Sequence, residues 1–93
     1  MTFYAKDPDS TVDYSFDWAA WLASGETITA TSWTVAPSDA DAPSLGSQTS
    51  VGTVQGIYVS GGMAGNRYRL TCHIETDAGR TGERSLSLRI MEQ

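Results

Sequence analysis

Hydrophobic and polar residues alternate from Tyr68 to Ile90, with one interruption. The hydrophobic positions are Tyr68, Leu70, Cys72 and Ile74 before it, and Leu86, Leu88 and Ile90 after it. A period of two is typical of a strand with one buried face. The interruption, Asp77-Ala78-Gly79, has the composition of a tight turn. The stretch therefore predicts a β-hairpin whose hydrophobic face the rest of the chain must cover.

Two earlier segments also have strand character. Val12, Tyr14 and Phe16 alternate with polar residues, which predicts a strand with its aromatic rings turned inward. The segment 26–35 is rich in β-branched residues, but Ile28 lies in the opposite phase to Trp33 and Val35. We expect a β-bulge between them, because exposing Trp33 would cost more than a local irregularity.

Between these strands, the sequence predicts one short helical turn near residues 18–22. Asp17 is a favourable N-cap and Gly25 a favourable stop. Trp18, Trp21 and Leu22 have the i, i+3, i+4 spacing of one helical face. A segment this short is not stable alone, so we expect it to pack over an open end of the sheets.

The remaining segments are less regular. Residues 36–48 indicate a loop or a broken edge strand, and glycines divide 49–60 into two short strands or one bulged strand. Residues 61–66 indicate a loop, and residues 1–6 a short N-terminal arm that a partner would order. Together these elements predict a single all-β domain over 1–93, an antiparallel β-sandwich of about seven short strands. Its edge strands would be open to extension by a partner's strand.

Composition narrows the classes of partner and cofactor. The net charge of −5 argues against binding to nucleic acid or to an anionic membrane surface. No hydrophobic run approaches the ~20 residues that a membrane-spanning helix needs, and no secretory signal is expected. The single cysteine excludes an internal disulfide and cysteine-based zinc sites. No cofactor is expected.

No catalytic constellation is predicted. Cys72 and His73 are neighbours in one strand, so their side chains point to opposite faces and cannot act as a nucleophile and its base. Asp7 and Asp9 have the spacing that begins a calcium loop, but the glycine and the closing glutamate are missing. Turn and capping roles are expected for the aspartates, namely Asp7, Asp9, Asp13, Asp17, Asp39 and Asp41.

Several residues are candidates for contact with a partner protein. In the hairpin, the polar face carries Arg69, Thr71, His73 and Glu75. Phe3 and Tyr4 are hydrophobic residues of the expected arm. The three tryptophans are expected mainly in the core, although Trp18 and Trp21 could divide between the core and a partner. An exposed aromatic row would instead favour a carbohydrate- or receptor-binding module, which is the alternative function.

Four segments in order resemble small proteins of tailed bacteriophages and prophages, the fiber–tail adaptor family. They are KDPDSTVDYSFDWAAWLASGETI, SWTV, VSGGMAGNRYRLT and TDAGRTGERSLSLRI, which together extend from Lys6 to Ile90. The resemblance implies an immunoglobulin-like β-sandwich and a structural, non-enzymatic role in the virion, where the protein joins fiber proteins to the tail or baseplate. It also implies assembly in the bacterial host cytoplasm, with multiple copies expected around the tail axis. Neither a disulfide nor the usual tyrosine corner of antibody domains is implied, because Cys72 is alone and Tyr68 precedes it by four residues.

Overall fold

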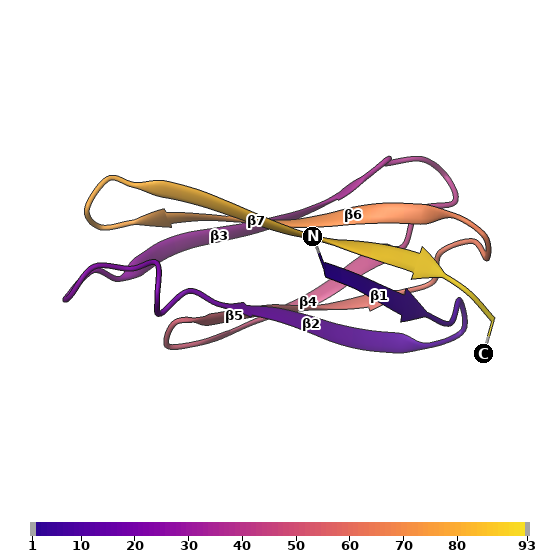
Figure 1. Ribbon diagram of the computed structural model, residues 1–93, viewed down its shortest axis with the longest axis horizontal. Helices are drawn as coiled ribbons and strands as arrows, with labels where there is room; N and C mark the ends of the chain where they lie inside the picture. The colour runs from indigo at the N-terminus through magenta and orange to yellow at the C-terminus, as the bar shows by residue number, and fades with distance from the viewer. Residues whose placement is uncertain (1, 93) are drawn as a thin grey trace.

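The chain folds into two packed β-sheets, shown by a computed structural model that describes residues 2–92 (Figure 1). The strands are β1 (Thr2–Lys6), β2 (Thr11–Asp17), β3 (Ile28–Ala36), β4 (Ser44–Val51), β5 (Val54–Ser60), β6 (Arg67–Thr76) and β7 (Thr81–Ile90). One sheet has the order β1-β7-β6-β3 and the other β2-β5-β4. The two layers lie one above the other in Figure 1. The predicted all-β sandwich of seven strands is therefore confirmed.

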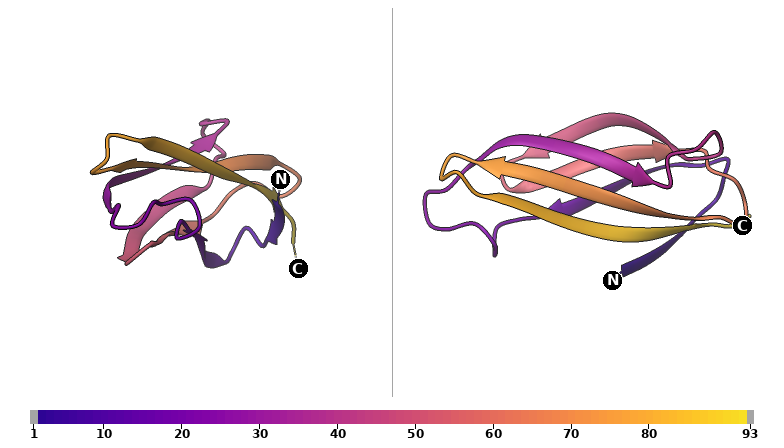
Figure 2. Two further views of the ribbon diagram at one scale, coloured as in Figure 1. Left: turned by 60° about the vertical axis from the view of Figure 1, so that its left-hand side comes forward. Right: turned by 90° about the horizontal axis from the view of Figure 1, so that it is seen from above.

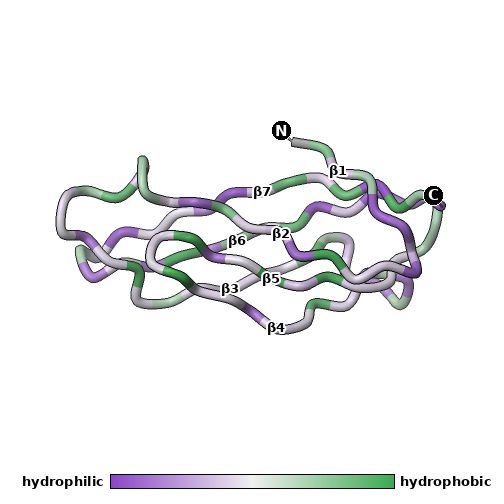
Figure 3. Tube along the Cα trace, turned by 90° about the horizontal axis from the view of Figure 1, so that it is seen from below, coloured by the Kyte–Doolittle hydropathy of each residue, from purple (hydrophilic) through white to green (hydrophobic). Residues whose placement is uncertain are grey.

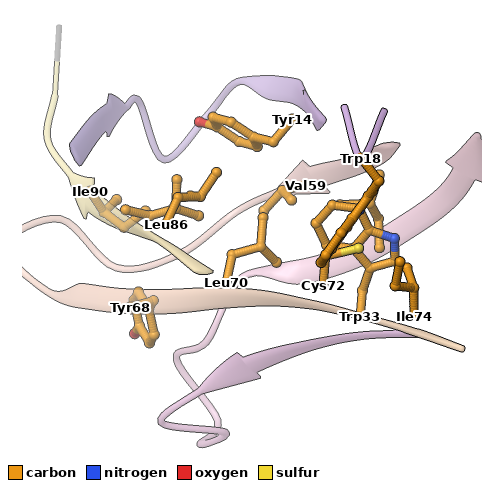
Figure 4. Close-up of a cluster of buried hydrophobic side chains, with 12 residues drawn as sticks. Tyr14, Trp18, Trp33, Val59, Tyr68, Leu70, Cys72, Ile74, Leu86 and Ile90 are labelled. Carbon is orange, nitrogen blue, oxygen red and sulfur yellow. The ribbon is translucent and has the colours of Figure 1, made fainter. Parts of the chain in front are cut away.

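The β6–β7 hairpin forms the centre of the four-stranded sheet. Its antiparallel register places Leu70 opposite Leu86 and Tyr68 opposite Leu88. The tube in Figure 3 shows hydrophobic and hydrophilic positions alternating along the chain. Each fully buried Leu or Ile side chain contributes about 1.5–3 kcal/mol to folding. The core contains Tyr14, Trp18, Trp33, Ile57, Val59, Tyr68, Leu70, Cys72, Ile74, Leu86, Leu88 and Ile90 (Figure 4).

The predicted bulge in β3 is confirmed. The pairing of β3 with β6 shifts register between Ile28, which pairs with Thr76, and Ala30, which pairs with Glu75. This irregularity lets Ile28 pack against the core although it lies in the opposite phase to Trp33. Trp33 is buried opposite Cys72 in β6.

In the region between β3 and the hairpin, the structure decides between alternatives that the sequence left open. Within residues 36–48, for which a loop or a broken edge strand was expected, residues 44–48 belong to β4, an edge strand whose residues are mostly exposed. Gly52 has a φ of 61° and turns the chain between β4 and β5, as glycine allows. Gly56 does not divide a strand, because it lies within β5 opposite Ser15 and Thr49.

Residues 2–6 form β1, which pairs in parallel with β7 from Thr2–Leu86 to Lys6–Ile90. The strand expected as an arm is therefore part of the chain's own sheet, while Met1 lies outside the described residues. Lys6 is 1% exposed, and its Nζ donates to the carbonyls of Asp7 at 2.9 Å and Gly61 at 2.8 Å. Burial lowers the Lys6 pKa. These bonds fix the end of β1 to the loop before β6.

The segment after β2 makes one hydrogen-bonded turn and does not continue into a helix. Trp21 N and Leu22 N donate to the Trp18 carbonyl at 3.0 and 3.1 Å, and Ala19 N donates to the Asp17 carboxylate at 3.0 Å. Trp18 enters the core with 1% of its surface exposed. The predicted cap and the one predicted turn are thus present. Within residues 2–92 the structure has no helix long and hydrophobic enough to cross a membrane.

The sandwich is elongated, with extents of 43 × 23 × 20 Å (Figure 2). The segments 18–27, 52–53 and 77–80 lie at one end, which we call the turn end. The loops 7–10, 37–43 and 61–66 lie at the opposite end. This shape leaves two broad sheet surfaces and two long sides on which partners can dock.

Candidate partner-binding surface

The surface of the four-stranded sheet that faces away from the core is called the outer face below. On β6 it carries Arg67, Arg69, Thr71, His73 and Glu75, which alternate with buried residues. The β7 residues opposite them are Arg89, Ser87, Ser85, Glu83 and Thr81. Arg69, His73 and Glu75, three candidates from the sequence, therefore share one face.

The middle of the outer face is polar and internally bonded. Thr71 Oγ1 and Ser85 Oγ are 2.8 Å apart, and His73 Nδ1 lies 3.0 Å from Glu83 Oε2. Toward the turn end, Glu75 and Glu83 give the face a negative end.

The opposite end of the outer face carries an arginine patch, which we define as Phe3, Arg67, Arg69 and Arg89. All four residues are exposed, and Phe3 is 59% exposed. Arg67 lies directly opposite Arg89, and Phe3 lies opposite Ser87. The Arg67 guanidinium lies 5.9 Å from the centroid of the Phe3 ring. Within residues 2–92, no carboxylate forms an ion pair with these three arginines.

Sequence analysis missed Arg67 and Arg89 as members of this patch. Arg67 has the same phase as Arg69 along one strand, so the alternation in the sequence was enough to place both on one face. Arg89 is distant in sequence, and only the register of the hairpin places it beside Arg67.

The other two arginines, Arg80 and Arg84, form contacts within the chain at the turn end. Arg80 Nε donates to the Glu26 carboxylate at 2.9 Å, and a second bond joins Arg80 to the other Glu26 oxygen. Thr76 Oγ1 and Ala23 N also donate to this carboxylate, at 2.6 and 2.8 Å. These hydrogen bonds lower the Glu26 pKa to about 2, and the bond from Arg80 has the largest effect. The Arg80 guanidinium also lies 4.1 Å from the centroid of the Trp21 ring.

Arg84 covers the neighbouring indole. Its guanidinium lies 4.6 Å from the centroid of Trp18, and its Nη1 donates to the Asp17 carbonyl at 2.8 Å. Trp18 and Trp21 meet edge to face at 5.5 Å. Gly82 occupies an inward position of β7, opposite Ile74, and leaves room for both rings. Trp18 is thus buried and Trp21 half-buried beneath Arg80, so the pair closes this end of the core.

Tyr4 is separated from the other candidate contacts. It lies in register with Leu88, on the inward side of β1, and its ring meets Tyr14 of β2 edge to face at 5.4 Å. Its exposed fraction of 44% arises at the rim where the two sheets meet. Tyr4 therefore closes the β1–β2 side of the sandwich, while Phe3 belongs to the outer face.

The side chains that could act in catalysis or bind a metal ion do not form a common site. Cys72 is fully buried, and desolvation raises its pKa to about 11, whereas His73 lies on the outer face. Asp7 accepts a hydrogen bond from Asp9 N at 2.8 Å, which is a turn role. Residues 2–92 contain no cluster of three His, Cys, Asp or Glu side chains placed to hold a metal ion.

The exposed aromatic residues do not form a row. Phe3 lies on the outer face, Tyr4 on the β1–β2 side, and Tyr58 on the exposed surface of the three-stranded sheet. A sugar ring would need stacking partners on one surface. This arrangement does not favour the carbohydrate-binding alternative.

Comparison with known proteins identifies the family. Residues 6–89 match the model of a family described as podophage GP4 fiber-tail adaptor protein gp77. No curated protein matches the chain. The match covers nearly all of the sandwich, from the end of β1 to the end of β7. The chain therefore belongs to the podophage fiber-tail adaptor family: it is a structural component of the phage tail that links fibers to the tail, and not an enzyme.

Proposed function

We propose that the arginine patch is a docking site of this adaptor for an acidic surface of its fiber or tail partner. The observation that carries the proposal is the direct opposition of Arg67 and Arg89, with Arg69 beside them, on an exposed face. Like charges directly opposite each other in a sheet destabilise it. Partner carboxylates would relieve that repulsion.

The distribution of the remaining charge supports the same conclusion. The chain has a net charge of −5 and only six basic residues. Lys6 is buried, and Arg80 and Arg84 are engaged at the turn end. The exposed cations without an ion pair in residues 2–92 are thus concentrated in the arginine patch. Guanidinium groups bind carboxylates in bidentate geometry, which gives orientation as well as attraction.

The rest of the outer face would extend the contact. His73 and Glu75 lie along the same strand as Arg69, and Phe3 adds a hydrophobic ring at the edge of the patch. A partner covering this surface would meet positive charge at one end and negative charge at the other. Such a pattern fixes the direction in which the partner lies.

The test compares two variants, both with a more negative net charge than the wild type, in binding to purified fiber and tail proteins of the same phage. Arg69→Gln combined with Arg89→Gln removes two positive charges from the patch. Ser15→Glu, on β2 of the other sheet, changes the net charge in the same direction and serves as the control. We expect binding to one partner at least tenfold weaker for the patch variant and a weaker salt dependence, because the lost contacts are charged. Unchanged affinity for both partners would refute the proposal.

We further propose that several copies surround the tail axis. Protein assemblies are mostly symmetric, so one copy of the adaptor is expected at each symmetry-related fiber attachment. Mass measurement of intact tails would give the copy number. A single copy per tail would overturn this proposal.

We also propose that the sandwich is immunoglobulin-like. When the strands are lettered A to G in chain order, the sheets contain B-E-D and G-F-C, as in immunoglobulin domains. Trp33 in the third strand and Cys72 in the sixth are cross-strand neighbours, which corresponds to the usual place of the buried tryptophan. In contrast to the constant-type arrangement, β1 pairs with β7 instead of β2. Superposition of an experimental structure on immunoglobulin domains would test the relationship; a different path of the B-E-D or G-F-C strands would contradict it.

A further inference from the structure

β3 lies at one edge of the four-stranded sheet. β3 pairs with β6 on one side only, and no other strand of residues 2–92 pairs with its second side. From Ala30 to Ala36 the register with β6 is continuous. A regular edge strand presents a row of backbone N–H and C=O groups, which is a template for another strand.

Beyond the bulge at Ile28–Ala30, this edge also lacks the features that normally prevent pairing. Ile28–Ala36 contains no charged residue, proline or glycine, and five of its nine residues are Ile, Val or Thr. The other edges are protected: β1 has five residues, β2 carries Asp13 and Asp17, and β4 shifts register between Leu45 and Gln48. β3 is therefore the edge best suited to strand addition.

A groove lies beside this edge, between β3 and β4. It has a volume of about 270 Å³ and is lined by residues of both strands and by Gln55 of β5. Gln55 spans its floor: its Oε1 accepts from Thr31 Oγ1 at 2.9 Å, and its Nε2 donates to Ser50 Oγ at 2.9 Å. These bonds satisfy the buried amide, and the bond to Thr31 joins the two sheets. The groove therefore has room for a side chain from a strand that lies along β3.

We propose that an extended, uncharged segment of a fiber or tail protein adds to the four-stranded sheet along β3, antiparallel or parallel, from Ala30 to Ala36. Its backbone would bond to the free edge, and one of its side chains would enter the groove. Main-chain bonds give affinity in such complexes, and pockets for alternate side chains give specificity. This inference rests on the adaptor function but not on the arginine patch. An adaptor must bind two proteins, and the β3 edge provides a second binding surface besides the arginine patch.

Charge favours a different protein over a second copy of this chain as the occupant. Two copies would each bring a net charge of −5, and their mutual repulsion opposes association. In an antiparallel pair of β3 strands, the acidic loop with Asp39 and Asp41 would also approach the neighbour's sheet. Neither of these repulsions opposes the binding of an uncharged segment along β3.

Hydrogen exchange of the full chain, free and in complex with purified tail or fiber protein, tests the proposal. Strand addition is expected to slow exchange of backbone amides in residues 30–36 at least tenfold, in the complex with one of the two partners. Ser32→Lys places a charge on this edge without altering the core and should weaken that complex at least tenfold. Ser15→Lys places the same charge on β2 and should bind as the wild type does.

The outcomes separate this inference from the arginine patch. If the patch variant loses binding while residues 30–36 gain no protection in either wild-type complex, the strand addition is wrong and the patch proposal stands. Protection of residues 30–36 together with normal binding by the patch variant supports the strand addition alone. If Ser32→Lys binds both partners as the wild type does, the inference is overturned. Protection that appears in the free chain as its concentration rises, with a dimer in sedimentation, would also overturn it, because the occupant would then be a second copy.

Discussion

Gly82→Ala is expected to destabilise the protein, although alanine normally improves a strand. A Cβ atom on Gly82 would lie 3.0 Å from Trp18 Cζ3 and 3.1 and 3.2 Å from two carbons of Trp21. These contacts are shorter than ordinary van der Waals separations of about 3.5–4.0 Å. Trp18 is 1% exposed and lies beneath the Arg84 guanidinium, so its ring has little freedom to move.

The expected change in the free energy of unfolding is the sum of two opposing contributions. Forcing a methyl group into a packed core costs about 1–3 kcal/mol. Replacing glycine in a strand gains roughly 0.5–1 kcal/mol, because the unfolded chain loses conformational freedom. We expect a net loss of about 1–2 kcal/mol in the free energy of unfolding, which lowers Tm by roughly 4–16 °C in a domain of this size.

Urea unfolding followed by tryptophan fluorescence would measure this loss as a lower midpoint with an unchanged slope. Gly46→Ala is the matched control. Gly46 lies in the edge strand β4, and a Cβ there would be 3.4 Å from the nearest atom, the Tyr58 carbonyl oxygen. That variant should be as stable as the wild type or slightly more stable. Equal or greater stability for Gly82→Ala would refute the packing of the two indoles on Gly82.

Three further predictions concern the core, acid stability and the thiol. Leu70→Ala removes a fully buried side chain and should lower the free energy of unfolding in urea by about 2–5 kcal/mol. Arg69→Ala, at the exposed neighbouring position, should change it by less than about 0.5 kcal/mol. Equal losses in the two variants would contradict the register of β6. Because the Glu26 pKa falls to about 2 on folding, its stabilising contribution is present above about pH 4.5 and is lost as the pH falls toward 2. Glu26→Gln should therefore lose less stability over that range than the wild type; parallel acid profiles would argue against the Arg80 contact. Burial raises the Cys72 pKa to about 11, so a thiol reagent at pH 8 should label the folded protein very slowly and the urea-unfolded protein rapidly; fast labelling without denaturant would place Cys72 outside the core.

The hairpin was predictable because one face of each strand is buried. Strict alternation along β6 and β7 placed Leu70 and Leu88 inside and Arg69 outside, and the structure agrees. The bulge in β3 was predictable for a related reason. Ile28 and Trp33 lie in opposite phases, and burial of both requires an irregularity between them.

The edge strands were harder to predict, because their stability comes from pairing and not from burial. β4 is exposed along nearly its whole length, so its sequence, SLGSQTSV, carries almost no alternation. β1 is five residues long, and its Phe3 and Tyr4 are both partly exposed. Nothing in such a segment indicates which strand it joins.

The candidate surface was predictable within one strand but not across strands. Alternation identified the polar face of β6, including Arg69, His73 and Glu75. The arginine patch depends on the register that brings Arg89 beside Arg67, and on the engagement of Arg80 and Arg84 elsewhere. Sequence reasoning also grouped Tyr4 with Phe3, although neighbouring residues of a strand point to opposite sides.

A cryo-EM reconstruction of the assembled phage tail would show where the sandwich lies and which groups of the partner face its arginine patch. We expect density for this sandwich between the fiber and the tail, with carboxylates of one partner facing Arg67, Arg69 and Arg89. A sandwich that lies between the two proteins but leaves the outer face in solvent would contradict the proposed docking site. A sandwich found away from the fiber attachment would contradict its role as the link between fiber and tail.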